Sequence, residues 1–305
     1  MVYSFCPAAI CSDGFGPAFA PIQGTDGNFY GTTYGGGTQG GGVAYQITPS
    51  GTNKVLYNFC NPNYQGSSCP DGNYLPTLTQ GANGNFYGIT EAGGSYNNGV
   101  VFELTSSGNY TVLHNFVNYQ HSGGWMSLGF PSTPLILASD KNLYGVVGGG
   151  PPWSWDEPAA GAMFEIPSAG GYKQLSAFEP RSNQGYNPLA ALFQATDGNF
   201  YGTTAYGGLL NHGSGYGTVF KFSSGLNPLV ETVPMGGKVG SSTLILGNNL
   251  SGTTGVTFNG VAANFTVGSD TYIKATVPAG ATTGTVSVVT PSGTLNSNPQ
   301  FVVTK

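Results

Sequence analysis

The 305-residue sequence predicts an all-β protein in which a four-bladed β-propeller precedes a small β-sandwich. Three observations predict this fold class. A short motif recurs at an even spacing, only 7% of the residues are charged where soluble domains usually have about a quarter, and turn signals crowd the C-terminal part. The 51 glycines and many aromatic residues favour strands and tight turns over helices.

The recurring motif is DGNFYGTT, which occupies residues 26–33 and returns unchanged at 197–204. Weaker copies read NGNFYGIT at 83–90 and DKNLYGVV at 140–147, so that the tyrosine recurs every 57 residues. A fixed period of this size indicates an array of similar structural units. Asp-Gly-Asn predicts a tight turn, and the aromatic pair is expected to pack between units. The glycine after the tyrosine is expected to let neighbouring backbones approach.

Each unit is interpreted as four short antiparallel strands. In the fourth copy an apolar run at 189–193 precedes the turn, FYGTTAY follows it, and GTVFKF comes after a glycine-rich loop. Earlier copies add a last strand, KVLYNF at 54–59 and TVLHNF at 111–116. Four-stranded units in series are typical of β-propeller blades, and residues 1–228 are therefore predicted to form four of them.

The two ends of this array complement each other. The fourth copy lacks a matching last strand, whereas the chain opens with VYSFC, which resembles LYNFC further along. The sequence favours ring closure, in which the strand Val2, Tyr3, Ser4 and Phe5 completes the fourth blade of its own chain. The alternative is that the same strand pairs with a neighbouring molecule and links subunits into a chain.

The four cysteines form two similar pairs, in SFCPAAICSDG and NFCNPNYQGSSCPDG. Their matching places in the repeat predict the disulfides Cys6–Cys11 and Cys60–Cys69. Zinc is disfavoured because CxxC spacing and histidine partners are missing, and no metal or cofactor is expected. Disulfides indicate an exported protein of the cell surface or extracellular space. The N-terminus does not look like a signal peptide, which we interpret as a mature or incomplete form.

Charge and hydropathy narrow the choice of partners. A net charge of −5 with eight Lys and Arg gives no basic surface for nucleic acid or anionic membranes. No apolar run approaches the roughly 20 residues of a transmembrane helix.

Three N-x-[ST] motifs, at Asn109, Asn249 and Asn264, are candidate N-glycosylation sites, although an Asn- and Thr-rich chain also produces such motifs by chance.

The 57-residue period ends near residue 229. Segment 229–305 is rich in Thr and Val and has turn signals about every eight to twelve residues, which predicts a β-sandwich of about seven strands. Its stretches GSSTLILGNNLSG, VTFNG and VPAGATTGTVSVVTPSG resemble an IPT/TIG domain, which has an immunoglobulin-like fold. The resemblance implies a spacer or protein-contact module.

The repeats in residues 1–225 resemble the bacterial GloVer (Gloeo/Verruco) tandem repeat, whose units read like DGNFYGTT, GTVFK and LYNF. The third copy departs from this pattern through DKNLYGVV and the insertion PPWSWDEPAAG. The resemblance implies an exported, often surface-anchored protein with little assigned chemistry.

The sequence offers few residues from which an active site could be built. Glu103 and Glu165 occupy matching points of two copies and are candidates for a glycan-active enzyme, which needs two opposed carboxylates. The same position holds Gln46 and Lys221, which is typical of a strand face in solvent. The adjacent acids at 156–157 rarely achieve such opposition. Three histidines without a metal-binding or nucleophile motif are expected to be structural: His114, His121 and His212.

All three tryptophans, Trp125, Trp153 and Trp155, lie in non-repeating loops. They are expected to stack on sugar rings, dock another protomer, or fold back over the propeller.

The leading prediction is a non-enzymatic structural or adhesive protein that self-associates head to tail into a fibre or surface array. The alternative is a carbohydrate-binding protein that uses these tryptophans, and the third is a glycan-active enzyme. Expected partners are thus further copies of the chain, glycans or other surface proteins.

Overall fold

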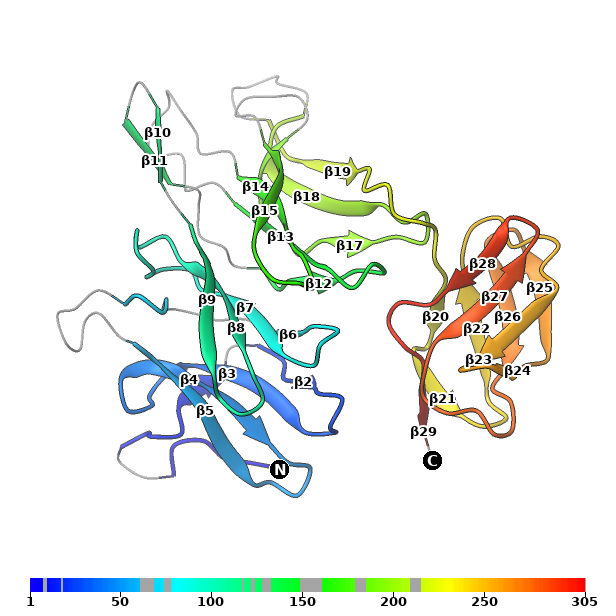
Figure 1. The fold of residues 1–305 in the computed structure, drawn as a ribbon, viewed down its shortest axis with the longest axis horizontal. Helices are drawn as coiled ribbons and strands as arrows, with labels where there is room; N and C mark the ends of the chain where they lie inside the picture. The colour runs from blue at the N-terminus through cyan, green and yellow to red at the C-terminus, as the bar shows by residue number, and fades with distance from the viewer. Residues whose placement is uncertain are drawn as a thin grey trace. The chain divides into compact units, whose positions relative to one another are not determined.

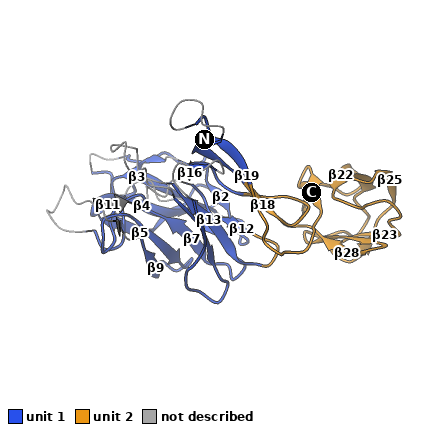
Figure 2. Cartoon of the chain, turned by 90° about the horizontal axis from the view of Figure 1, so that it is seen from above, with its two compact units in different colours: residues 1–137, 141–192, 202–220 blue, residues 138–140, 193–201, 221–305 orange. Residues whose placement is uncertain are grey.

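The computed structural model describes residues 1–7, 10–17, 19–60, 69–73, 78–116, 118–121, 124–127, 133–148, 161–178, 185–208 and 215–304. Every regular element among them is a β-strand, which confirms the all-β class. These residues contain no helix that could span a membrane. Figure 2 shows two units, the first with residues 1–137, 141–192 and 202–220 and the second with 138–140, 193–201 and 221–305.

Four antiparallel sheets follow the four copies of the motif along the chain (Figure 1). The first sheet contains β1 (Phe15–Pro17), β2 (Ile22–Gln23), β3 (Phe29–Gly35), β4 (Gly40–Ile47) and β5 (Asn53–Cys60). The second contains β6 (Thr79–Gln80), β7 (Phe86–Ile89), β8 (Val100–Leu104) and β9 (Tyr110–Asn115). A separate hairpin pairs β10 (Asn118–His121) with β11 (Gly124–Ser127).

The third sheet contains β12 (Ile136–Leu137), β13 (Leu143–Val147), β14 (Ala162–Ile166) and β15 (Lys173–Ala177). The fourth contains β16 (Tyr186–Pro188), β17 (Phe193–Gln194), β18 (Phe200–Tyr206) and β19 (Thr218–Phe222), and β18 pairs with the other three. We count the strands of each sheet from the one just before the motif turn, which is β2, β6, β12 or β17. On this count β4, β8, β14 and β19 are the third strands, and β5, β9 and β15 are the last strands.

The motif forms the predicted turn in every copy. Its second residue has a left-handed backbone, which glycine adopts without steric cost. The φ angles are 83°, 82°, 70° and 84° at Gly27, Gly84, Lys141 and Gly198. The lysine of the third copy thus keeps the turn geometry in a region that non-glycine residues rarely occupy.

The glycine after the tyrosine has a different role from the predicted one. Gly31 lies opposite Tyr45 in the pairing of β3 with β4, and Gly145 lies opposite Phe164 in the third sheet. A Cβ atom on Gly31 would lie 2.4 Å from the Tyr45 hydroxyl, and one on Gly145 would lie 2.6 Å from the Phe164 ring. The glycine therefore makes room for an aromatic ring of its own sheet rather than for a neighbouring backbone.

The inner strands of the second and third repeat sheets are buried on both faces. In β8, Val100, Phe102 and Leu104 join a cluster with residues of the first sheet. Val101, on the opposite face of the same strand, joins a cluster with residues of the third sheet, such as Phe164. The alternation of side chains along a strand makes this double burial possible.

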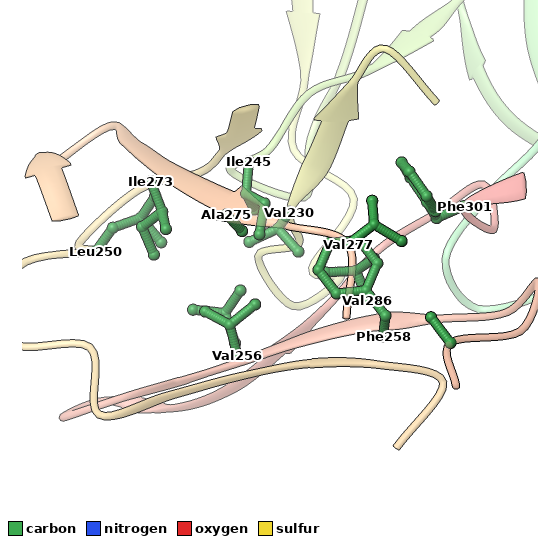
Figure 3. Close-up of a cluster of buried hydrophobic side chains, with 12 residues drawn as sticks. Val230, Ile245, Leu250, Val256, Phe258, Ile273, Ala275, Val277, Val286 and Phe301 are labelled. Atoms are coloured by element: carbon green, nitrogen blue, oxygen red, sulfur yellow. The ribbon is translucent and has the colours of Figure 1, made fainter. Parts of the chain in front are cut away.

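A second packed core lies in the C-terminal part of unit 2. One sheet has the order β20 (Glu231–Val233), β22 (Ser242–Leu246), β26 (Tyr272–Thr276) and β25 (Phe265–Ser269). Another has the order β24 (Val261–Ala262), β23 (Gly255–Phe258), β27 (Val286–Thr290) and β28 (Gly293–Asn296). β21 (Gly236–Lys238) pairs in parallel with β29 (Val302–Thr304). Figure 3 shows the buried side chains of this core, among them Ile245, Phe258 and Phe301.

The predicted in-chain ring closure is absent from the structure. Residues 2–5 lie in no strand, and among the described strands β19 pairs with β18 alone. Tyr3 and Phe5 instead pack against the first sheet, on the cluster that contains Tyr45. The Tyr3 hydroxyl donates to Asp13 Oδ2 at 2.6 Å and fixes the segment there. The segment is therefore held on the first sheet next to its own disulfide.

The C-terminal core provides a stability prediction. Ile245 is fully buried in β22, whereas its neighbour Leu244 points outward and is 40% exposed. Ile245→Ala should destabilise the core by about 2–5 kcal/mol, because it removes buried methyl groups and leaves a cavity. Leu244→Ala should cost less than about 1 kcal/mol. Urea unfolding followed by hydrogen exchange of peptides from residues 242–290 measures both, and equal losses would contradict this packing.

Candidate functional site

The first, second and fourth repeat turns each carry a hydrogen-bonded cluster around the motif tyrosine. In the first sheet the Tyr30 hydroxyl donates to Asp26 Oδ2 at 2.7 Å and accepts from Gln46 Nε2 at 2.7 Å. Backbone N–H of Asn28 also donates to Asp26 Oδ1, which closes the turn. Desolvation and the bond to Asp26 raise the pKa of Tyr30 above its ordinary value, so the phenol remains a donor.

The second copy exchanges the positions of the carboxylate and the amide. Asn83 replaces the turn aspartate, and Glu103 of the third strand supplies the carboxylate instead. Glu103 Oε1 accepts from the Tyr87 hydroxyl at 2.8 Å and from Asn85 Nδ2 at 2.7 Å. Desolvation, together with the bond to Glu103, raises the pKa of Tyr87 to about 12. The tyrosine hydroxyl again donates to one carboxylate, but this carboxylate belongs to the third strand and not to the turn.

The fourth copy adds a cation to the same arrangement. Asp197 Oδ2 accepts from the Tyr201 hydroxyl at 2.9 Å and lies 3.0 Å from Lys221 Nζ. Desolvation would raise the pKa of Asp197, but hydrogen bonds from Asn199, Lys221 and Tyr201 outweigh it and hold the pKa far below its ordinary value. This carboxyl group is therefore ionised in the folded chain at neutral pH.

The two candidate catalytic carboxylates are bound within their own sheets. Glu103 has the partners named above, and Glu165 accepts from Asn142 Nδ2 at 2.8 Å and lies 3.4 Å from Lys173 Nζ. Glu165 is only 9% exposed, so the interpretation of this position as a strand face in solvent is wrong for the third sheet. Both carboxylates hold a repeat together, which is the role that their geometry supports.

Successive sheets are joined by a repeated aromatic contact. A phenylalanine at or just after the end of one last strand packs edge-to-face on the aromatic residue of the next sheet's third strand. Residue Phe5 occupies the corresponding place before the first sheet. The pairs are Phe5 with Tyr45, Phe59 with Phe102, Phe116 with Phe164, and Phe178 with Phe220, with ring centroids 4.9, 5.7, 5.9 and 5.1 Å apart.

A repeated glutamine contact accompanies the aromatic one. Gln80 Oε1 in the second sheet accepts from the backbone N–H of Thr25, in the turn of the first copy, at 3.0 Å. Gln194 Oε1 in the fourth copy accepts in the same way from Ser139 of the third at 2.9 Å. Both links span 55 residues, so residues at the same positions of the repeat meet in these two places.

The fourth sheet ends in an exposed apolar edge, which we call the β19 surface and define as Tyr216 and Val219. These side chains are 87% and 77% exposed. The third strands VAYQI, VVFEL, AMFEI and TVFKF align, and the residues that match Val219 are at most 1% exposed. Those residues are Ala44, Val101 and Met163. This position of the repeat is therefore buried in three sheets and exposed in the fourth.

The structure contains both predicted disulfides, Cys6–Cys11 and Cys60–Cys69. Asp71 lies beside the second pair in a grouping that metal ions can use. Its sulfurs are already bonded to each other, and Asp71 Oδ2 accepts from the Tyr57 hydroxyl at 2.8 Å. This grouping therefore links the end of β5 to residues 69–71 and corresponds to Tyr3 with Asp13 near the first disulfide.

The other predicted residues lie at separate places. Trp125 lies in β11 and His121 in β10, while Trp153, Trp155, His212 and the acids at 156–157 fall outside the described residues. Their proposed roles remain predictions. The His114 ring stacks on Tyr172 at 3.6 Å, and burial lowers the pKa of His114, which fits a structural role. The three sequon asparagines are exposed: Asn109, Asn249 and Asn264.

Comparisons with known proteins identify a repeat family. The model of the Gloeobacter/Verrucomicrobia repeat matches residues 17–268. No curated protein matches the chain.

Two solved structures are similar to the chain at a low level. One is an inactive virginiamycin B lyase from Staphylococcus aureus with quinupristin, at 14% identity, 90% coverage of this chain, 78% of that chain and a TM-score of 0.35. The other is an engineered GH43 glycoside hydrolase with endo-xylanase and exo-arabinofuranosidase activity, at 14% identity, coverages of 93% and 67% and a TM-score of 0.32. At these scores neither enzyme bears on the chemistry of this chain.

The fourth turn gives a pH prediction. The folded-state pKa of Asp197 lies below 3.8, the ordinary value for Asp. The carboxylate therefore stabilises the fold above about pH 3.8, and this contribution disappears as the pH falls from there through the folded pKa. Asp197→Asn should lower the melting temperature at pH 7, and its difference from the wild type should shrink near pH 2.

Circular dichroism at both pH values measures this difference. Lys221→Met is the matched control, since it removes one donor and should reproduce only part of the loss. A wild-type advantage that is the same at both pH values would contradict the role of the Asp197 charge.

Proposed function

The chain belongs to the Gloeobacter/Verrucomicrobia repeat family, and we propose that it is a non-enzymatic extracellular protein with a structural or adhesive role. In this proposal the chain self-associates head to tail into a fibre or surface array. Two features support it: an apolar sheet edge left exposed at one end of the repeat array, and a first sheet whose contacts match that edge.

The β19 surface is the observation that carries the proposal. Val219 is 77% exposed, although Ala44, Val101 and Met163 are buried at the same repeat position. Burying a Val side chain stabilises a contact by roughly 1.5–3 kcal/mol, so an edge of this composition favours association. An unpaired strand also offers backbone groups to an incoming strand.

The first sheet presents the other half of the contact. Tyr45, in β4, already receives Phe5 in the same way that Phe102 receives Phe59 from the preceding sheet. A fourth sheet of another copy would thus meet a surface built like those that the second and third sheets already pack on. Two different surfaces that recognise each other make a heterologous contact, and such a contact produces filaments when it does not close.

Architecture and chemistry fit a durable extracellular component. Two disulfides and exposed sequon asparagines favour an oxidising, extracellular environment. We propose that the four repeat sheets are propeller blades in residues 1–228. The C-terminal sheets would form an IPT/TIG, immunoglobulin-like module in residues 229–305, which would serve as a protein-contact module.

Self-association has a direct test. Light scattering on a size-exclusion column should show a mass that rises with protein concentration, and electron microscopy should show rods or filaments. Val219→Lys should weaken association at least about tenfold, equivalent to about 1.4 kcal/mol, because it places a charge in the contact.

Val289→Lys is the matched control. Val289 is a strand valine of the C-terminal core that is 41% exposed and lies far along the sequence from the β19 surface. This variant should assemble like the wild type. A protein that stays monomeric at high concentration would sink the proposal.

A further inference from the structure

We propose that residues 2–5 of one copy pair as an antiparallel last strand along β19 of a second copy, with Ser4 opposite Thr218 and Tyr3 opposite Val219. This inference rests on the proposed self-association and specifies its joint. It assigns a donor segment, an acceptor edge and a register.

The register comes from the three complete sheets. Each third strand pairs with a last strand at the same repeat position. The pairs are Val43 with Asn58, Val100 with Asn115, and Ala162 with Ala177. Thr218 is the matching residue of TVFKF, and VYSFC aligns with LYNFC so that Ser4 matches Asn58. The expected pair is therefore Ser4 with Thr218.

The acceptor strand has the properties that strand addition requires. Among the described strands β19 pairs only with β18, on one side. Thr218 N donates to Thr204 Oγ1 at 3.1 Å, which holds the start of β19 against β18, and the side chain of Val219 is 77% exposed. Incoming main-chain groups would pair with the outer edge of β19, and the side chain of Tyr3 would cover Val219.

The donor segment is held in a suitable place. Phe5 packs on Tyr45 at 4.9 Å, and Asp13 accepts from the Tyr3 hydroxyl and from the backbone N–H of Cys6. Phe59 stands in the same relation to the second sheet while β5 is paired with β4. A segment in this position can therefore belong to one sheet by hydrogen bonds and pack on the next by its aromatic rings.

A second copy is favoured as the acceptor over the same chain. Residues 2–5 and residues 218–220 of β19 belong to one compact unit, yet residues 2–5 lie in no strand there. Pairing with a second copy leaves the contacts of Tyr3, Phe5 and Cys6 with the first sheet and Asp13 in place. Each copy then contributes one donor and one acceptor, which gives an open chain of subunits.

Cysteine cross-linking between different chains tests the joint. Chains carrying only Ser4→Cys are mixed with tagged chains carrying only Thr218→Cys and oxidised mildly. The expected product is a disulfide-linked pair of one tagged and one untagged chain, in which mass spectrometry finds residue 4 joined to residue 218.

Thr294→Cys is the matched control, because Thr294 is exposed in β28, an edge strand of the C-terminal core. Mixed with Ser4→Cys chains, it should yield at least about tenfold less linked product.

Three outcomes would overturn the inference. If the double variant Ser4→Cys, Thr218→Cys links only within single chains, the strand closes its own ring. If wild-type filaments form but residues 4 and 218 do not cross-link, self-association stands and the joint lies elsewhere. If the wild type stays monomeric and no link forms, both the joint and the proposed function fail.

Discussion

Thin sheets that must bury both faces impose the main constraint on this protein. A sheet of short strands presents apolar side chains on two sides, and only a neighbouring sheet can cover each side. The second sheet satisfies this requirement, with Val101 and Phe102 pointing from one strand into two different clusters. An array built this way has two unmatched outer faces. Tyr3 and Phe5 cover part of one, and the β19 surface leaves the other open.

A second constraint acts within each repeat. The motif tyrosine needs an acceptor for its hydroxyl, and Asp26, Glu103 and Asp197 supply one carboxylate each from either the turn or the third strand. Because the acceptor can come from two places, the turn residue and the strand residue can change together without loss of the cluster. The variation of these positions is therefore compatible with a purely structural role.

Much of the local structure could be predicted from the sequence. The turn followed from Asp-Gly-Asn, the disulfides from matching cysteine pairs, and the repeat sheets from the 57-residue period. These features depend on residues close together in the sequence or on the repetition itself. The clusters of Tyr87 with Glu103 and of Gly31 with Tyr45 were missed, because cross-strand register brings those residues together. The aligned position of Glu103 and Gln46 opposite the tyrosine was the signal that could have revealed the first.

The docking of Phe5 on the first sheet was likewise beyond sequence reasoning, because pattern similarity identifies a last strand without saying which sheet receives it.

Hydrogen exchange of the β19 amides, measured in dilute and in assembled protein, tests the central claim most directly. The account predicts rapid exchange in the monomer and strong protection on assembly, while amides of β8 and β14 stay protected in both. Protection of β19 that is already complete in the monomer would contradict it.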